Sequence, residues 1–141
     1  MEYKKLNAEK ILVRLDKDDE IVAALAEIAA KESITLAMVQ GLGAVKKVVM
    51  GAYNVPRQEY NRNTIEGVFE MLSLTGTMDT MKGEPYSHFH IVVGDENGRA
   101  WGGHLNEAIV SATAEIIVTL LPGNVDREKN GEVGLNVWKF Q

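Results

Sequence analysis

The stretch from Tyr86 to Leu105 reads YSHFHIVVGDENGRAWGGHL and contains every histidine of the chain: His88, His90 and His104. The first two lie in an apolar, β-branched run that predicts a strand, and the polar segment after it predicts a turn. A second predicted strand carries the third histidine directly after two glycines. The stretch is therefore a predicted β-hairpin that gathers all the imidazoles of a 141-residue protein.

The two faces of the first predicted strand differ in chemistry. Because side chains alternate along a strand, Phe89, Ile91 and Val93 share one face, which we expect to point into the core. His88 and His90 share the other face and lie about 6–7 Å apart, from the rise of a strand. That separation suits two ligands of one metal ion, because Zn–N bonds are about 2.0–2.1 Å long.

The length of the turn decides where His104 lies. A two-residue turn would place it on the core face. A three-residue loop over residues 96–98, with its glycine in the left-handed conformation, would pair Asp95 with Arg99 and set His104 opposite His90. Only this second register lets the three histidines act together, and we predict it.

Three imidazoles on one face predict a site for a divalent transition metal, most simply zinc. The fourth position would be open to water or to a small-molecule ligand. The alternative is that the histidines are only polar residues on the solvent-facing side of a sheet, but their gathering on one hairpin favours the metal. A serine–histidine–aspartate triad is disfavoured, because Ser87 alternates to the opposite face and no nucleophile elbow is present. The residues do not decide between an enzyme and a binding protein.

The clearest helix is predicted over residues 16–33, where apolar residues recur at spacings of three and four. Asp16 or Asp18 can cap its start, and Lys31 suits its C-terminal end. The apolar positions that define the helix are Ile21, Ala24, Leu25 and Ile28.

After the helix, the pattern changes to strands. Gly41 and Gly43 lack the other residues of a phosphate-binding loop and predict a bulge or tight bend. Residues 68–78 predict a long strand on which Glu70 shares a largely apolar face, either at an exposed rim or buried with a partner. Residues 56–67 predict a loop, and residues 106–113 predict an irregular or briefly helical connection. One helix followed by about seven strands predicts an α+β fold with a mainly antiparallel sheet.

The composition is that of an ordinary globular protein, with 45% hydrophobic and 25% charged residues. Its length predicts a single domain over residues 1–141. The absence of cysteine excludes disulfides and thiolate ligands. We expect a cytoplasmic protein with no membrane partner, because no signal-like segment or membrane-length apolar run is present. The net charge of −5 and the scattered basic residues disfavour direct DNA binding.

Several motifs together resemble the plant-and-prokaryote-conserved (PPC) domain. The resemblance covers nearly the whole chain and implies a seven-stranded antiparallel sheet with a flanking helix, assembled as a homotrimer. It also implies that His88, His90 and His104 are metal ligands, as in some prokaryotic single-domain members. Glu70 matches the family's Phe-Glu pair, either as a further ligand or as a support for the site or the fold. The motifs are GLGAV (41–45), GVFEMLSLTGT (67–77), HFH (88–90), GRAWGGHL (98–105) and TAEIIV (113–118).

In plants, this domain follows an AT-hook in nuclear proteins and mediates self-association. The present sequence has no Arg-Gly-Arg-Pro hook and no basic tail, so the minor-groove reader of those proteins is missing. Two alternatives to a metal-binding protein stay open. One is a DNA-associated regulatory or nucleoid protein that acts through an oligomeric surface or a partner, and the other is an oligomerisation module only.

Overall fold

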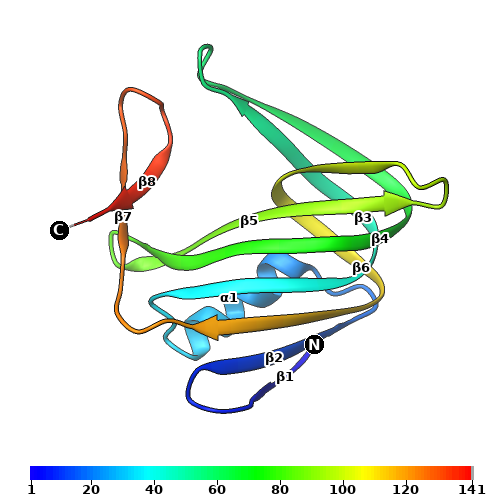
Figure 1. Ribbon diagram of the computed structural model, residues 1–141, viewed down its shortest axis with the longest axis horizontal. Helices are drawn as coiled ribbons and strands as arrows, with labels where there is room; N and C mark the ends of the chain where they lie inside the picture. Colours follow the sequence, from blue (N-terminus) through cyan, green and yellow to red (C-terminus); the bar gives the residue numbers. More distant parts are fainter. Residues whose placement is uncertain (141) are drawn as a thin grey trace.

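The structure, a computed structural model, describes residues 1–140 and contains one helix and eight strands in that range. Six strands form one antiparallel sheet, and the last two form a separate hairpin (Figure 1). The predicted α+β class with a mainly antiparallel sheet is confirmed. The elements are β1 (Glu2–Lys5), β2 (Lys10–Asp16), α1 (Ile21–Lys31), β3 (Ala37–Asn54), β4 (Glu59–Met81), β5 (Glu84–Asp95), β6 (Ala100–Leu120), β7 (Asp126–Lys129) and β8 (Asn136–Lys139).

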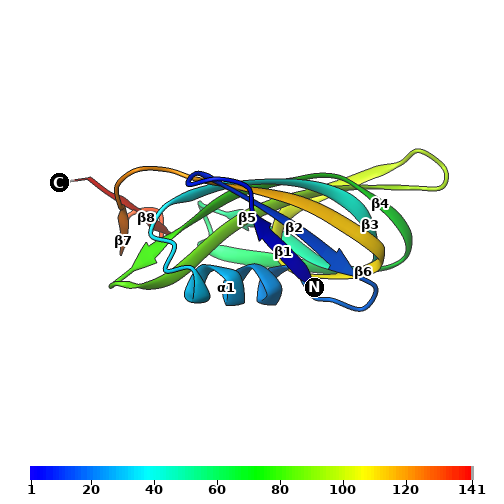
Figure 2. The ribbon, with the colours of Figure 1, turned by 90° about the horizontal axis from the view of Figure 1, so that it is seen from below.

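The large sheet curls back on itself. Its strand order is β1-β2-β6-β3-β4-β5, and β5 also pairs with β6, so that β3, β4, β5 and β6 form a closed ring of pairings. Helix α1 lies along one face of this sheet (Figure 2). The core lies between the helix and the sheet, where Leu25 and Ile28 of α1 join Phe89 and Ile91 of β5 in one buried cluster.

The helix begins later than the sequence predicts, and its cap is a different acid. Glu20 precedes the first turn, and its carboxylate accepts hydrogen bonds from the backbone N–H groups of Val22 (3.0 Å) and Ala23 (2.6 Å). Asp16 does not cap the helix, because it still belongs to β2. The predicted apolar positions are buried, and Lys31 lies in the last turn as expected.

Two predicted connections are instead parts of long strands. Residues 59–67 begin β4, and residues 59–66 pair with residues 47–54 of β3 in a hairpin that projects beyond the rest of the sheet (Figure 1). Most of them are exposed, which explains a polar sequence without the alternation of a half-buried strand. Residues 106–113 lie inside β6, which pairs with β3 on one side through several irregularities of register. The predicted bulge near Gly41 and Gly43 is confirmed.

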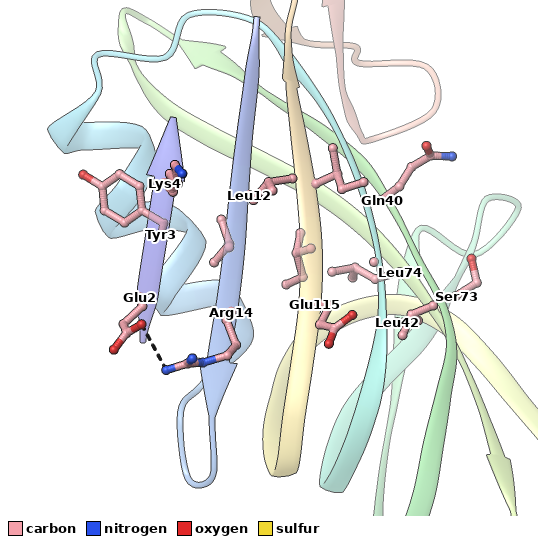
Figure 3. Close-up of a pocket in the computed structure, with 14 residues that line it drawn as sticks. Glu2, Tyr3, Lys4, Leu12, Arg14, Gln40, Leu42, Ser73, Leu74 and Glu115 are labelled. Atoms are coloured by element: carbon pink, nitrogen blue, oxygen red, sulfur yellow. Dashed lines mark ion pairs between the residues drawn. The ribbon is translucent and has the colours of Figure 1, made fainter. Parts of the chain in front are cut away.

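The face of the sheet away from α1 is partly apolar. Leu12, Leu42 and Ile117 are 40%, 57% and 47% exposed. They line a hollow of about 710 Å³ that spans β2, β6 and β3, bordered by charged groups such as Arg14 and Glu115 (Figure 3).

In the described part of the chain, no helix has the length and apolar character needed to cross a membrane.

Candidate metal centre

The turn between β5 and β6 has the register that the three histidines require. The backbone N–H of Asp95 donates to the carbonyl of Arg99 (2.9 Å), and the N–H of Gly98 donates to the carbonyl of Asp95 (3.0 Å). Gly98 has a φ of 76°, in the left-handed region. His90 therefore lies directly opposite His104. The predicted three-residue loop is confirmed.

This register brings the three imidazoles together. One ligand nitrogen from each ring lies within 4.8 Å of the others, and among residues 1–140 no other group of three histidine or acidic side chains is as suited to holding a metal ion. The ring centroid of His88 lies 5.1 Å from the ring centroid of His90 and 5.1 Å from that of His104. A tetrahedral zinc ion with bonds of about 2.0–2.1 Å needs ligand nitrogens about 3.3 Å apart.

The backbone of β6 just before His104 is packed tightly against the backbone of β3. A side chain at Gly103 would place its Cβ 2.6 Å from the carbonyl oxygen of Gly51 on β3. Only glycine therefore lets β3 and β6 approach at this point. Backbone packing thus accounts for the second of the two glycines that precede His104.

Burial favours the metal-binding form of two of the histidines. It lowers the pKa of His88, and the nearby His104 and Arg127 lower this pKa further. Burial also lowers the pKa of His104, with a smaller contribution from His90. Both shifts favour the neutral imidazole, which has a lone pair free for a metal ion.

A buried ion pair lies next to the site, and no local pattern in the sequence predicts it. Arg127 of β7 donates to both carboxylate oxygens of Asp79 on β4, each at 2.7 Å, and the two residues are 6% and 1% exposed. The indole N–H of Trp138 donates to the same carboxylate (2.8 Å). The Arg127 guanidinium also lies over the ring of Tyr86, 4.6 Å from its centroid. These contacts fix the β7–β8 hairpin beside the histidines.

The three histidines line a cavity of about 670 Å³. One wall is the β3–β4 hairpin, from which Tyr60 donates a hydrogen bond to the amide oxygen of Asn106 (2.6 Å). The ring of Tyr60 meets that of His104 edge-on, with centroids 5.9 Å apart. Another wall is the β7–β8 hairpin with the loop between its strands, which contributes Arg127 and Leu135. The Tyr60 wall was missed because residues 56–67 were predicted as a loop, and the second wall was missed because Arg127 is held there by Asp79 on a distant strand.

Glu70 does not join the histidines within one protomer. It is exposed and pairs with Ala44 on β3 and Gly94 on β5. Gly94 is four residues from His90 along β5, which is about 13 Å at the rise of a strand. Of the two interpretations left open, the structure agrees with an exposed rather than a buried carboxylate, although β4 is paired on both sides at Glu70 and is not a sheet edge there.

Residues 4–122 match the sequence model of the Plants and Prokaryotes Conserved (PCC) domain. The chain belongs to this family. The PPC resemblance inferred from the sequence motifs is thereby confirmed.

Solved structures of similar proteins share the PCC fold over nearly the whole chain. A candidate DNA-binding protein from Bacteroides thetaiotaomicron is 30% identical, with a TM-score of 0.95, 99% of this chain covered and 96% of that one. A metal-containing protein from Archaeoglobus fulgidus is 28% identical, with a TM-score of 0.89 and 99% of each chain covered. A PPC protein from Pyrococcus horikoshii is 28% identical, with a TM-score of 0.85, 99% of this chain covered and 94% of that one. No curated protein matches the chain in sequence.

Proposed function

We propose that this PCC-domain protein is a homotrimer that binds one zinc ion per protomer through His88, His90 and His104. The observation that carries the proposal is the convergence of the three ligand nitrogens within 4.8 Å on one face of the sheet. The similar protein from Archaeoglobus fulgidus is described as metal-containing, which supports metal binding by a protein of this fold.

The donor set favours a divalent transition metal over magnesium or calcium, and zinc is the metal that we propose. Imidazole suits zinc, copper, iron and nickel, whereas magnesium and calcium require oxygen ligands that this group lacks. Three histidines with an open fourth position are a known arrangement for zinc. Bound there, zinc would supply Lewis-acid chemistry at the open position. The residues of the chain would hold the ion, keep two of its ligands neutral, and shape the cavity in front of it.

Metal content tests this proposal directly. Protein purified without an affinity tag is analysed by inductively coupled plasma mass spectrometry as wild type, His90→Ala and Thr75→Ala. Thr75 lies opposite His90 on β4 and is exposed, so its variant is a control for substitution on the same face. We expect about one zinc ion per protomer in wild type and Thr75→Ala, and a small fraction of that in His90→Ala. Equal and negligible metal in wild type and His90→Ala would remove the proposal.

The homotrimer is the assembly that the family resemblance implies. The exposed apolar hollow on the face of the sheet away from α1 supports it, because such surfaces in soluble proteins commonly bind other protein chains (Figure 3). In the proposed assembly, Leu12, Leu42 and Ile117 are covered by a neighbouring protomer.

DNA association is the second candidate function. Two similar structures, from Bacteroides thetaiotaomicron and Ralstonia eutropha, are described as candidate DNA-binding proteins. The net charge of −5 opposes direct binding to duplex DNA, so this function would need an oligomeric surface or a partner. Binding to duplex DNA that weakens steeply as salt rises would support this second function. A protein that binds neither metal nor DNA would be an oligomerisation module only.

A further inference from the structure

We infer that the cavity in front of the three histidines binds a small organic carboxylate with a flat apolar body. The inference rests on the proposed function, because the carboxylate would occupy the open position of the bound metal ion. The class of ligand follows from the charge of the residues that line the cavity, from the register of the strands that carry them, and from the shape of the cavity walls.

The charge of the lining is the first argument. The chain has 20 acidic and 15 basic residues. Among the described residues that line this cavity, however, none is acidic, while two are arginines and three are histidines. The charge of Arg127 is already balanced by Asp79 behind the wall. Arg62 has no carboxylate within ion-pair distance in residues 1–140, so it is a free cation at the edge of the cavity.

The strand register places Arg62 in line with the metal site. Arg62 on β4 lies opposite Gly51 on β3, which lies opposite His104 on β6, which lies opposite His90 on β5. Directly paired residues of antiparallel strands share a face, and neighbouring strands are about 4.8 Å apart. The backbone of Arg62 is thus about 10 Å from that of His104. A ligand of a few ångströms can therefore lie between the metal and the guanidinium.

The walls suit a flat apolar body. Tyr60 on β4 and Tyr86 on β5 both line the cavity, and Leu135 adds an aliphatic surface. The hydroxyl of Tyr60 is already bonded to Asn106, which leaves its ring as the contact surface. The cavity volume of about 670 Å³ lies in the range typical of small-molecule sites.

Isothermal titration calorimetry of the zinc-loaded protein tests the inference with benzoate as the probe. Benzamide is the neutral probe of the same shape, and inorganic phosphate is an anion without a flat body. The variants are Arg62→Gln and Arg57→Gln. Arg57 lies on the same hairpin but is exposed, is paired with Glu59, and is not part of the cavity lining. Zinc content is measured on each sample beforehand.

We expect benzoate to bind at least about tenfold more tightly than benzamide or phosphate. Arg62→Gln should weaken benzoate by about tenfold, the size of one hydrogen bond to a charged group, while Arg57→Gln leaves it unchanged. Benzoate binding should also vanish when the zinc is removed with a chelator.

Two kinds of failure are distinguishable. Protein that holds zinc but binds benzoate no better than benzamide, or binds phosphate more tightly, would overturn the inference and leave the proposed function standing. Equal weakening in Arg62→Gln and Arg57→Gln would likewise overturn it. Protein that takes up no zinc would remove the proposed function, and the inference with it.

Discussion

At the scale of single residues, the Asp79–Arg127 pair links the fold to the metal site. Both side chains are almost completely buried, and Asp79 also accepts the indole N–H of Trp138. Asp79 is two residues from Thr77, which lies opposite His88. The ion pair thus stabilises the strand that pairs with the one carrying His88, although neither charged group belongs to the histidine cluster.

Removing one partner of this pair should be costly. Asp79→Ala leaves the buried Arg127 guanidinium without its carboxylate partner, so we expect a loss of about 3–5 kcal/mol in the free energy of unfolding. Urea unfolding of the metal-free protein measures it. Glu128→Ala removes a partner from the exposed Lys139–Glu128 pair of the same hairpin, and should cost no more than about 1 kcal/mol. Similar losses in the two variants would contradict a special role for the buried pair.

The depressed pKa values of His88 and His104 predict how pH acts on the metal-free protein. Their folded pKa values lie below the unfolded value of about 6.5, so the unfolded chain binds more protons as the pH falls past that value. Stability should therefore be full above pH of about 6.5 and decline below it. Urea unfolding at pH values from about 8 to 5 measures the decline, and His88→Gln should make it shallower. A stability that rises on acidification through this window would contradict the assignment.

At the scale of elements, the β5–β6 hairpin shows which parts of the structure a sequence can specify. Its faces follow from local alternation, and its register follows from the turn, so residues 86–105 contain the information needed for both. The helix was predictable for the same reason. Its cap was not, because Glu20 also accepts the N–H of Ala108, 88 residues away in the chain (3.0 Å).

The missed strands and the buried ion pair have non-local causes. Residues 59–67 form a strand because β3 pairs with them, although most of their side chains are exposed. Arg127 looks like one charge among several in a glycine-containing segment, and only its contact with Asp79 on β4 makes it a buried residue. Sequence reasoning therefore found the proposed ligands but not the walls of their cavity.

Gly98, which has a left-handed backbone conformation in the β5–β6 turn, allows a prediction at the scale of elements. A Cβ on Gly98 would meet no atom within 4 Å, so Gly98→Ala tests backbone conformation alone. We expect it to lower the free energy of unfolding by about 1–2 kcal/mol, the cost of the left-handed conformation for a residue with a side chain. Gly131 also has open space but is not among the residues with positive φ, and Gly131→Ala should change stability by less than about 1 kcal/mol. Equal effects of the two variants in urea unfolding would contradict the turn geometry.

At the scale of the whole molecule, the proposed homotrimer explains why the sheet keeps an apolar outer face. Leu42→Lys would place a charge in the hollow of Figure 3, and we expect it to shift the protein from trimer to monomer. Light scattering coupled to gel filtration reports the mass, which is 15.5 kDa for one chain. Val68→Lys is the matched control, because Val68 is apolar and 67% exposed but lies outside the hollow. A wild type that runs as a monomer, or equal effects of both variants, would contradict the assembly.

The metal site is the central claim, and it joins all three scales, since it needs three residues, one hairpin register and a cavity built by distant segments. Anomalous diffraction from a crystal of untagged protein, recorded on both sides of the zinc absorption edge, tests it most directly. We predict a difference peak within bonding distance of nitrogens from His88, His90 and His104, present above the edge and lost below it. A map with no peak among the three imidazoles, from protein purified without chelators and supplied with zinc, would contradict it.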